Sequence, residues 1–257
     1  MSDATDNGPW LLLWDIDGTL LIGASMEHAR VMFAVLQEVH GTDDPARGEP
    51  ITLRRAAERS GMTDGQIGRE ILLENGIDPA QIDARFAVVV RRASEDYDPG
   101  DLSGHVNPGV GAVLAEMAER DDVAQSLVTG NFERIARTKL RAAGIDEWFD
   151  PALGGGFGSD HEQRQFLPEI ARKRAGAALR ADGSPWPRER TIIIGDTPRD
   201  IDCARHDGVR VVAIATGPHP PERLEEADAV ATDAESLRDA LVAIIGLPRP
   251  PRPASNG

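Results

Sequence analysis

The chain has 257 residues, and its 28 basic side chains against 43 acidic ones give a formal net charge of −15. This balance speaks against a protein that holds nucleic acid through phosphate contacts, because no basic block offsets the acidic excess. No stretch approaches the ~20 apolar residues that cross a bilayer, segment 1–8 is too polar for a signal peptide, and the single cysteine, Cys203, excludes an intramolecular disulfide framework. We therefore expect a soluble, cytoplasmic protein, monomer or homodimer, with neither nucleic acid nor membrane as partner.

The first predicted element is a strand over residues 10–14, which is wholly apolar and stops at Asp15-Ile16-Asp17-Gly18-Thr19. A short apolar run bounded by turn residues is typical of a strand buried on both faces of a parallel sheet. Asp15 and Asp17 are two positions apart, so in extended backbone their side chains point to one side. Such close carboxylates repel each other unless a cation lies between them or one of them is protonated. Mg²⁺ prefers carboxylate oxygens and water, and would relieve this repulsion while also binding phosphate.

A long helical interval separates this strand from the next one. Its periodicity and turn residues predict helices at 26–40, 51–59, 64–74 and 79–93. We interpret residues 22–100 as an inserted helical cap. The core would then be discontinuous, formed by 1–21 and 101–247, and the Pro-, Arg- and Ser-rich tail 248–257 is predicted to be disordered.

Strands and helices alternate through the rest of the chain. This alternation predicts right-handed βαβ units and a Rossmann-like, doubly wound parallel sheet, an α/β fold. The predicted strands are 123–128, 191–194 and 209–215, and the predicted helices are 132–143, 165–179 and 199–206.

Polar residues follow several of these strands. Thr129 ends the second strand, while Asp196 ends the third and Asp200 lies one helical turn later. Ligands of open α/β sheets bind outside the carboxyl ends of the strands, so we expect these side chains beside Asp15 and Asp17. A helix cap would explain any one of these residues alone. It does not explain the set.

At this point the sequence resembles the haloacid dehalogenase (HAD) superfamily. Asp15-Ile16-Asp17-Gly18-Thr19-Leu20 resembles the first motif of that family, Leu127-Val128-Thr129-Gly130-Asn131 its second, and Gly195-Asp196-Thr197-Pro198-Arg199-Asp200 its fourth. The helical block between the first two motifs is where members similar to phosphoglycolate phosphatase carry a cap. The third motif is a Lys or Arg before the fourth, for which Arg164 at a helix start is favoured over Lys173.

The resemblance implies a Mg²⁺-dependent phosphatase that hydrolyses a small phosphorylated metabolite through an aspartyl-phosphate. Asp15 would be the nucleophile and Asp17 the general acid and base. The metal would be held by Asp15, the backbone carbonyl of Asp17, and Asp196, with Asp200 orienting metal-bound water. The remaining phosphoryl oxygens would be bound by Thr129, Gly130 and Arg164.

Two alternatives stay open. A sugar phosphomutase of the same superfamily would share the first step, and a catalytically idle member would act as a binding or scaffold protein. A Schiff-base mechanism is disfavoured because the predicted cap, 22–100, contains no lysine.

Substrate specificity is expected on the cap, because the core site meets only the phosphate. Arg54, Arg55 and Arg69 are candidates, but the segment Ser60–Asp64 resembles the loop with which such caps face the core. Thr63 and Asp64 are therefore the specificity residues we name. A plain helix N-cap at these two positions is the competing interpretation.

Overall fold

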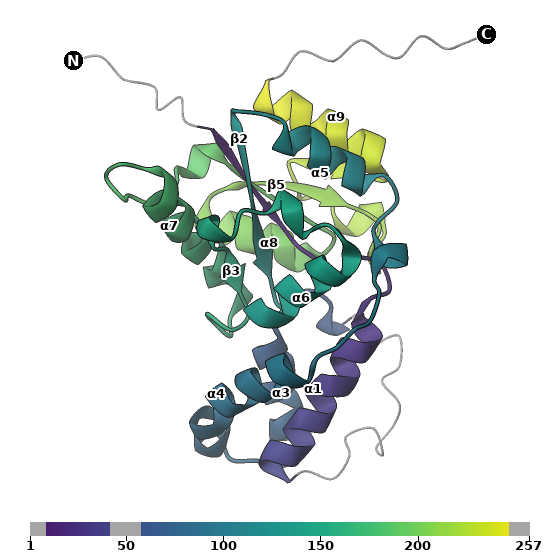
Figure 1. The fold of residues 1–257 in the computed structure, drawn as a ribbon, viewed down its shortest axis with the longest axis vertical. Coiled ribbons are helices and arrows are strands. Elements are labelled where there is room, and N and C mark those ends of the chain that lie inside the picture. The colour runs from purple at the N-terminus through teal and green to yellow at the C-terminus, as the bar shows by residue number, and fades with distance from the viewer. Residues whose placement is uncertain (1–8, 42–57, 247–257) are drawn as a thin grey trace.

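Residues 9–41 and 58–246 are described by the computed structural model, and they form an α/β molecule built on one parallel sheet (Figure 1). Within these residues, six strands lie in the order β3-β2-β1-β4-β5-β6, and each neighbouring pair is parallel. The predicted doubly wound α/β fold is thereby confirmed. The strands are β1 (Trp10–Trp14), β2 (Val123–Thr129), β3 (Gly156–Phe157), β4 (Thr191–Gly195), β5 (Arg210–Ile214) and β6 (Ala229–Ala231).

Strand β1 lies between β2 and β4, and both of its faces are buried. Leu12 and Trp14 point into one apolar core, and Leu11 and Leu13 point into the other. This alternation explains why the run has no polar residue, since a strand covered by helices on both faces has no solvent side.

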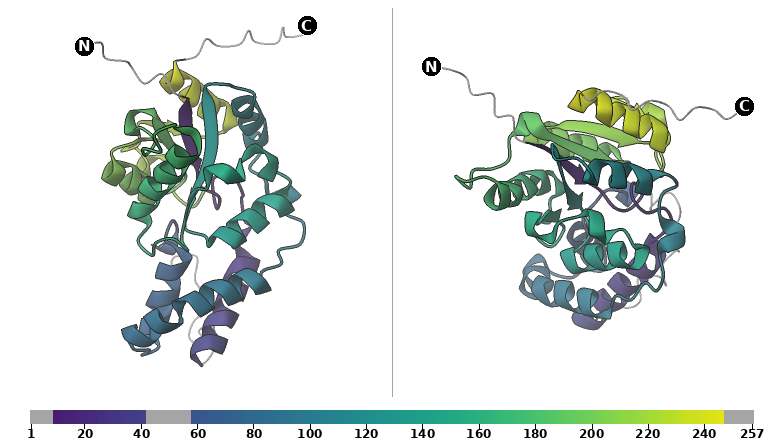
Figure 2. Two further views of the ribbon diagram at one scale, coloured as in Figure 1. Left: turned by 60° about the vertical axis from the view of Figure 1, so that its left-hand side comes forward. Right: turned by 45° about the horizontal axis from the view of Figure 1, so that its top comes forward.

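Helices cover the two faces of the sheet (Figure 2). Apolar residues of α5, α6 and α9 pack on the face with Trp14, whereas those of α7 and α8 pack on the face with Leu13. These helices are α5 (Val110–Ala118), α6 (Glu133–Ala143), α7 (Leu167–Leu179), α8 (Pro198–Asp207) and α9 (Ala234–Ile245). Short 3-10 helices are η2 (Ser103–His105), η3 (Asp146–Trp148), η4 (Pro151–Leu153), η5 (Arg164–Phe166), η6 (Arg188–Arg190) and η7 (Pro221–Arg223).

Three further helices lie together below the sheet in the view of Figure 1, and we call them the helical group. They are α1 (Ser25–His40), α3 (Asp64–Glu74) and α4 (Pro79–Asp96). Their buried faces share one apolar cluster, which also contains Phe132 and Ile135 from the start of α6. The helical group is thus joined to the sheet through the element that follows β2.

The predicted helices at 26–40, 64–74 and 79–93 correspond to α1, α3 and α4. Part of the predicted helix at 51–59, together with Arg54 and Arg55, lies outside the described residues, and so does the tail 248–257. Within residues 9–41 and 58–246, every helix is too short or too polar to cross a bilayer.

Candidate active site

The ends of β1, β2 and β4 bring the predicted site residues to one edge of the sheet. Asp15 and Asp196 directly follow β1 and β4, and Thr129 is the last residue of β2, so all three lie at the carboxyl ends of parallel strands. The chain continues from β1 to β2 on one side and reaches β4 on the other side. Such a reversal of strand order opens a crevice in which α/β proteins bind ligands. The Asp15 amide donates to the Ile194 carbonyl at 2.9 Å, which fixes Asp15 beside the end of β4.

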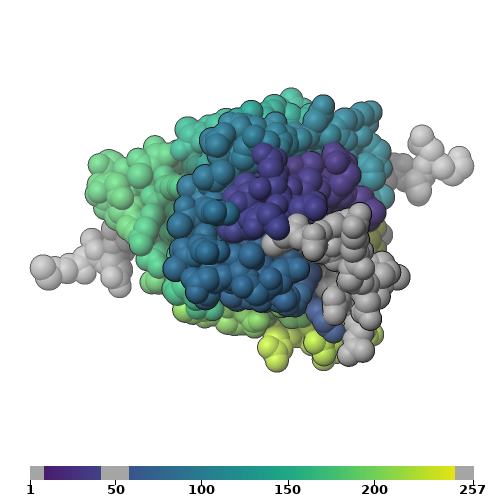
Figure 3. Space-filling model, turned by 90° about the horizontal axis from the view of Figure 1, so that it is seen from below, coloured from purple at the N-terminus to yellow at the C-terminus, as the bar shows by residue number. Residues whose placement is uncertain are grey.

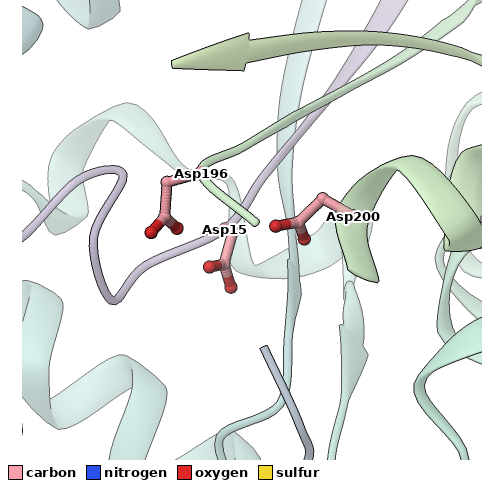
Figure 4. A group of neighbouring side chains, drawn as sticks. All are labelled: Asp15, Asp196 and Asp200. Atoms are coloured by element: carbon pink, nitrogen blue, oxygen red, sulfur yellow. The ribbon is translucent and has the colours of Figure 1, made fainter. Parts of the chain in front are cut away.

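Three carboxylates gather in this crevice (Figure 4). Asp15, Asp196 and Asp200 each place one oxygen within 4.8 Å of the others, and all three residues are buried. Burial raises the pKa of Asp15 to about 7, although Arg164 lowers it, and burial likewise raises the pKa of Asp196. Buried carboxylates this close repel each other, so the cluster suits an added positive charge.

Asp196 has the features expected of a cation ligand. Its Oδ1 accepts from Thr19 Oγ1 at 3.2 Å, while its buried Oδ2 has no hydrogen-bond partner among the described residues. A Cβ on Gly18 or Gly217 would come within 2.1 or 1.7 Å of that Oδ2, so both positions need glycine for the chain to approach it. An orphaned carboxylate oxygen beside Asp15 fits a hard cation that takes oxygen ligands.

Asp200 is engaged differently. Its Oδ2 accepts from the backbone amide and the hydroxyl of Thr197, at 3.0 and 2.7 Å, in the capping box of α8. Its Oδ1 accepts from Arg164. With both oxygens occupied, Asp200 positions its neighbours, whereas Asp15 and Asp196 retain capacity for a ligand.

Arg164 is the cation that the structure brings to Asp15. Only 6% of its surface is exposed, and Nη2 lies 3.0 Å from Asp15 Oδ1 while also contacting Asp200. Lys173 instead lies on α7 with 58% of its side chain exposed and pairs with Glu169 at 2.7 Å. Of these two candidates for the third motif, Arg164 has the geometry to balance a phosphoryl group.

Asp17 points toward α6 and the start of α1. Its carboxylate lies 2.6 and 2.7 Å from Lys139 Nζ, and it accepts from Asn131 Nδ2 at 2.9 Å and Ser25 Oγ at 3.0 Å. Burial opposes ionisation, but the charge of Lys139 prevails and lowers the pKa of Asp17 to about 2. Asp17 is therefore an anion in this arrangement.

Lys139 lies at this site but was not predicted from the sequence. Its side chain is fully buried on α6, and its ammonium group ends at Asp17. A signal was present: Lys139 lies four positions after Ile135 and before Ala143, both buried, so helical spacing puts a lysine on the buried face. A lysine in such a place needs a carboxylate partner.

Thr129 and Gly130 line the same crevice, and Thr129 is 1% exposed. The Asn131 amide lies 3.4 Å from Thr129 Oγ1 as a donor, which leaves the hydroxyl hydrogen available to a ligand. Gly130 meets the loop before α3, where a Cβ would come within 2.3 Å of the Met62 carbonyl oxygen.

The two predicted specificity residues, Thr63 and Asp64, face different surroundings. Thr63 caps α3 by accepting from the Gln66 amide at 3.1 Å and donates to the Glu162 carbonyl at 2.6 Å, as an N-cap that also joins α3 to the core. Asp64 lines the cavity, where its Oδ2 lies 3.1 Å from His28 Nε2 and accepts from the Phe132 amide at 2.8 Å. Only Asp64 of the pair borders the space beside Asp15.

Comparison with known proteins identifies the class. A family model described as haloacid dehalogenase-like hydrolase matches residues 12–205. The chain belongs to this family, as its motifs predicted. Members of the family usually use a metal ion, and the Asp15, Asp196 and Asp200 cluster could bind one.

Three named relatives show how far the similarity extends. A putative pyrophosphatase PpaX from Caldanaerobacter subterraneus is 31% identical over 54% of this chain and 59% of its own length. The tyrosine-protein kinase PtkA from Mycobacterium tuberculosis is 26% identical over 91% of this chain and 72% of its own. A phosphoglycolate phosphatase from Pseudomonas fluorescens is 24% identical over 81% of this chain and 70% of its own length. The match thus spans less than two thirds of the first of these proteins.

The fold is shared with solved structures. The β-phosphoglucomutase of Clostridium difficile superimposes with a TM-score of 0.64 at 15% identity, over 93% of this chain and 97% of that one. Similarity at this level concerns the fold alone. Membership of the hydrolase family rests on the family model, and the proteins that the chain resembles include one named as a phosphatase and one named as a phosphomutase.

Proposed function

We propose that the protein is a Mg²⁺-dependent phosphatase that hydrolyses a small phosphate monoester through an aspartyl-phosphate on Asp15. One observation supports this most strongly: the buried Asp15 lies 3.0 Å from Arg164 Nη2 and close to Asp196, whose Oδ2 has no hydrogen-bond partner among the described residues. Asp15 is a carboxylate nucleophile beside a guanidinium group and beside a second carboxylate that can bind a cation. The two positive charges would balance those of an incoming phosphoryl dianion. In this proposal the helical group is the cap and residues 22–100 are its extent.

Asp15 attacks phosphorus, forming an oxygen–phosphorus bond as the ester oxygen departs, and water then attacks the same phosphorus and releases Asp15. Mg²⁺ would be held by Asp15, the Asp17 carbonyl and Asp196, and when bound it would balance the charge on the phosphoryl oxygens. The Thr129 hydroxyl, the Gly130 amide and Arg164 bind the other oxygens. Asp200 holds Arg164 in place for this contact.

Asp17 gives a proton to the departing oxygen and later takes one from the attacking water. Lys139 holds it as an anion before substrate arrives. A phosphoryl dianion placed beside it raises its pKa, because like charges disfavour the ionised form. Substrate binding thus prepares Asp17 to carry the proton.

The test is phosphate release from an aryl phosphate with Mg²⁺ and with EDTA. Asp15→Asn should lower the rate by at least about a thousandfold, since nucleophilic catalysis is lost. Asp121→Asn, at an exposed position in the turn before β2, is the matched control and should keep the full rate. Undiminished activity of Asp15→Asn would refute the proposal.

A phosphomutase remains the second candidate, because it shares the aspartyl-phosphate and differs only in the acceptor. Transfer of labelled phosphate to a second hydroxyl of the substrate, without release of inorganic phosphate, would favour it. A scaffold protein would show neither reaction.

A further inference from the structure

A cavity of about 490 Å³ extends from Asp15 toward the helical group. This volume lies within the range of sites that enclose a small molecule. Asp15, Thr129 and Arg164 form its end at the sheet, where the phosphoryl group of the proposed reaction would lie. The opposite part is therefore where the rest of the substrate must fit.

Most of the side chains in that opposite part are apolar. Its wall is built from the inward faces of α1 and α3 and from the loop before α3. The outer sides of α1 and α3 lie on the face of the molecule seen in Figure 3. The side chains that define it are Met32, Phe33, Leu36, Met62, Ile67 and Ile71. Such a wall gains free energy by removing apolar surface from water and offers few hydrogen bonds to sugar hydroxyls.

Basic groups in the wall already face carboxylates. Among the described lining residues, Arg59 lies near two glutamates, with Nε 3.9 Å from Glu70 Oε2 and Nη2 3.6 Å from Glu74 Oε1. His28 Nε2 lies 3.1 Å from Asp64 Oδ2. Arg164 is committed to Asp15 and Asp200. Within the described part of this wall, each basic side chain therefore has an acidic neighbour, and a second anionic group on the substrate would approach Asp64.

We infer that the substrate is a phosphate monoester of an uncharged, predominantly apolar alcohol, whose body lies against α1 and α3. This inference rests on the proposed phosphatase function and adds the chemical class of the leaving group. Phosphoglycolate, sugar phosphates and pyrophosphate lie outside this class of substrate.

The experiment compares esters of primary alcohols, which differ little in the intrinsic reactivity of the leaving group. Hexyl phosphate and 2-phenylethyl phosphate are compared with methyl phosphate, glucose 6-phosphate and phosphoglycolate at saturating Mg²⁺. From methyl to hexyl phosphate, kcat/KM should rise by up to about fourfold for each methylene buried. The kcat/KM values of both apolar esters should exceed those of glucose 6-phosphate and phosphoglycolate by at least about tenfold.

Two variants test whether the preference for apolar esters depends on the side chains of this wall. Ile67→Arg should lower kcat/KM for hexyl phosphate by at least about tenfold and raise it for phosphoglycolate, because it adds a cation and removes apolar surface. Leu73→Arg, on the same helix α3 but 44% exposed, is the matched control and should leave both values unchanged. Phe33→Ala is a milder second variant, which should lower kcat/KM for hexyl phosphate but not for methyl phosphate.

The outcomes separate the two claims. Glucose 6-phosphate or phosphoglycolate turned over as efficiently as hexyl phosphate would overturn the inference while leaving the phosphatase proposal intact. If no ester is hydrolysed, the phosphatase proposal fails, and calorimetry then decides the inference: hexyl phosphate must bind more tightly than phosphoglycolate, and the reverse order overturns it.

Discussion

The two lysines of this chain lie in opposite environments. Lys139 is fully buried with its Nζ 2.6 Å from Asp17 Oδ2, whereas Lys173 is largely exposed and pairs with Glu169 on the surface of α7. Removing one partner of a buried ion pair leaves a charge without compensation, while an exposed pair contributes little. The same substitution should therefore have very different effects at the two positions.

We predict that Lys139→Met lowers the free energy of unfolding at pH 7 by about 2–4 kcal/mol. Lys173→Met should change it by less than about 0.5 kcal/mol. Although burial raises it, the pKa of Asp17 is lowered from 3.8 to about 2, chiefly by Lys139, so this stabilisation is present above pH 4 and is lost as the pH falls toward 2. Urea denaturation of both variants at pH 7 and pH 3 measures this, and equal stability of the two variants would contradict it.

Asp196 gives a prediction about metal removal. Because burial raises its pKa, the folded protein holds a proton that the unfolded chain releases, and the free energy of unfolding falls as the pH rises above about 4. Asp196→Asn removes this charge and should raise the melting temperature in EDTA at pH 8, by about 2–4 °C for each kcal/mol of stability gained. The gain should be smaller at pH 5.

Mg²⁺ should raise the melting temperature of the unmodified protein but not that of Asp196→Asn, because the variant lacks a ligand. Asp121→Asn is the control and should respond to Mg²⁺ in full. A Mg²⁺ response that survives Asp196→Asn would exclude Asp196 as a ligand.

Some of these residues could be predicted from sequence and others could not. Asp15, Asp17 and Asp196 follow apolar strands, so a local pattern reveals them. The Lys139–Asp17 pair joins positions 122 residues apart, and its partner is defined only when α6 packs beside the end of β1. The helical spacing around Lys139 could have shown that this lysine is buried, but not which residue it contacts.

At the scale of elements, the turn after β2 is where the helical group meets the sheet. The Gly130 carbonyl accepts from the Asp64 amide at 2.8 Å, and a Cβ on Gly130 would clash with the Met62 carbonyl. Gly158 approaches the same turn, since its own Cβ would come within 2.0 Å of the Gly130 oxygen. Three segments distant in sequence thus meet at one small residue.

Gly130→Ala should accordingly destabilise the protein by about 1–3 kcal/mol, because backbone atoms must move to admit the methyl group. It should also raise KM, since the loop before α3 would separate from the phosphate-binding turn. Gly104→Ala is the matched control, because nothing lies within 4 Å of its Cβ position, and it should change stability by less than about 0.5 kcal/mol. Unfolding curves and steady-state kinetics of both variants provide the comparison.

Element prediction succeeded where the apolar pattern is long and failed where it is short. The helix over 64–74 has the same bounds as α3, because Thr63 caps it and Asn75-Gly76 ends it. Strands β3 and β6 have two and three residues and were not predicted. Segments this short show no periodicity, and they are strands only because β2 and β5 pair with them.

At the scale of the whole molecule, the helical group and the sheet edge enclose one cavity between them. The order of elements predicted an insert after β1, and parallel strands predicted that it leaves from the carboxyl edge. The chemistry of the cavity wall could not be predicted in this way, because it depends on which faces of α1 and α3 turn toward Asp15. An amphipathic helix shows only that it has an apolar face.

The central claim is that Asp15 becomes phosphorylated during turnover, and its most direct test is covalent trapping. Borohydride added during turnover of hexyl phosphate reduces an acyl phosphate to homoserine, which mass spectrometry can locate in the peptide that contains Asp15. We expect this modification at Asp15 alone, and only when both substrate and Mg²⁺ are present. Steady phosphate release with no modification at Asp15, or with modification at another carboxylate, would contradict it.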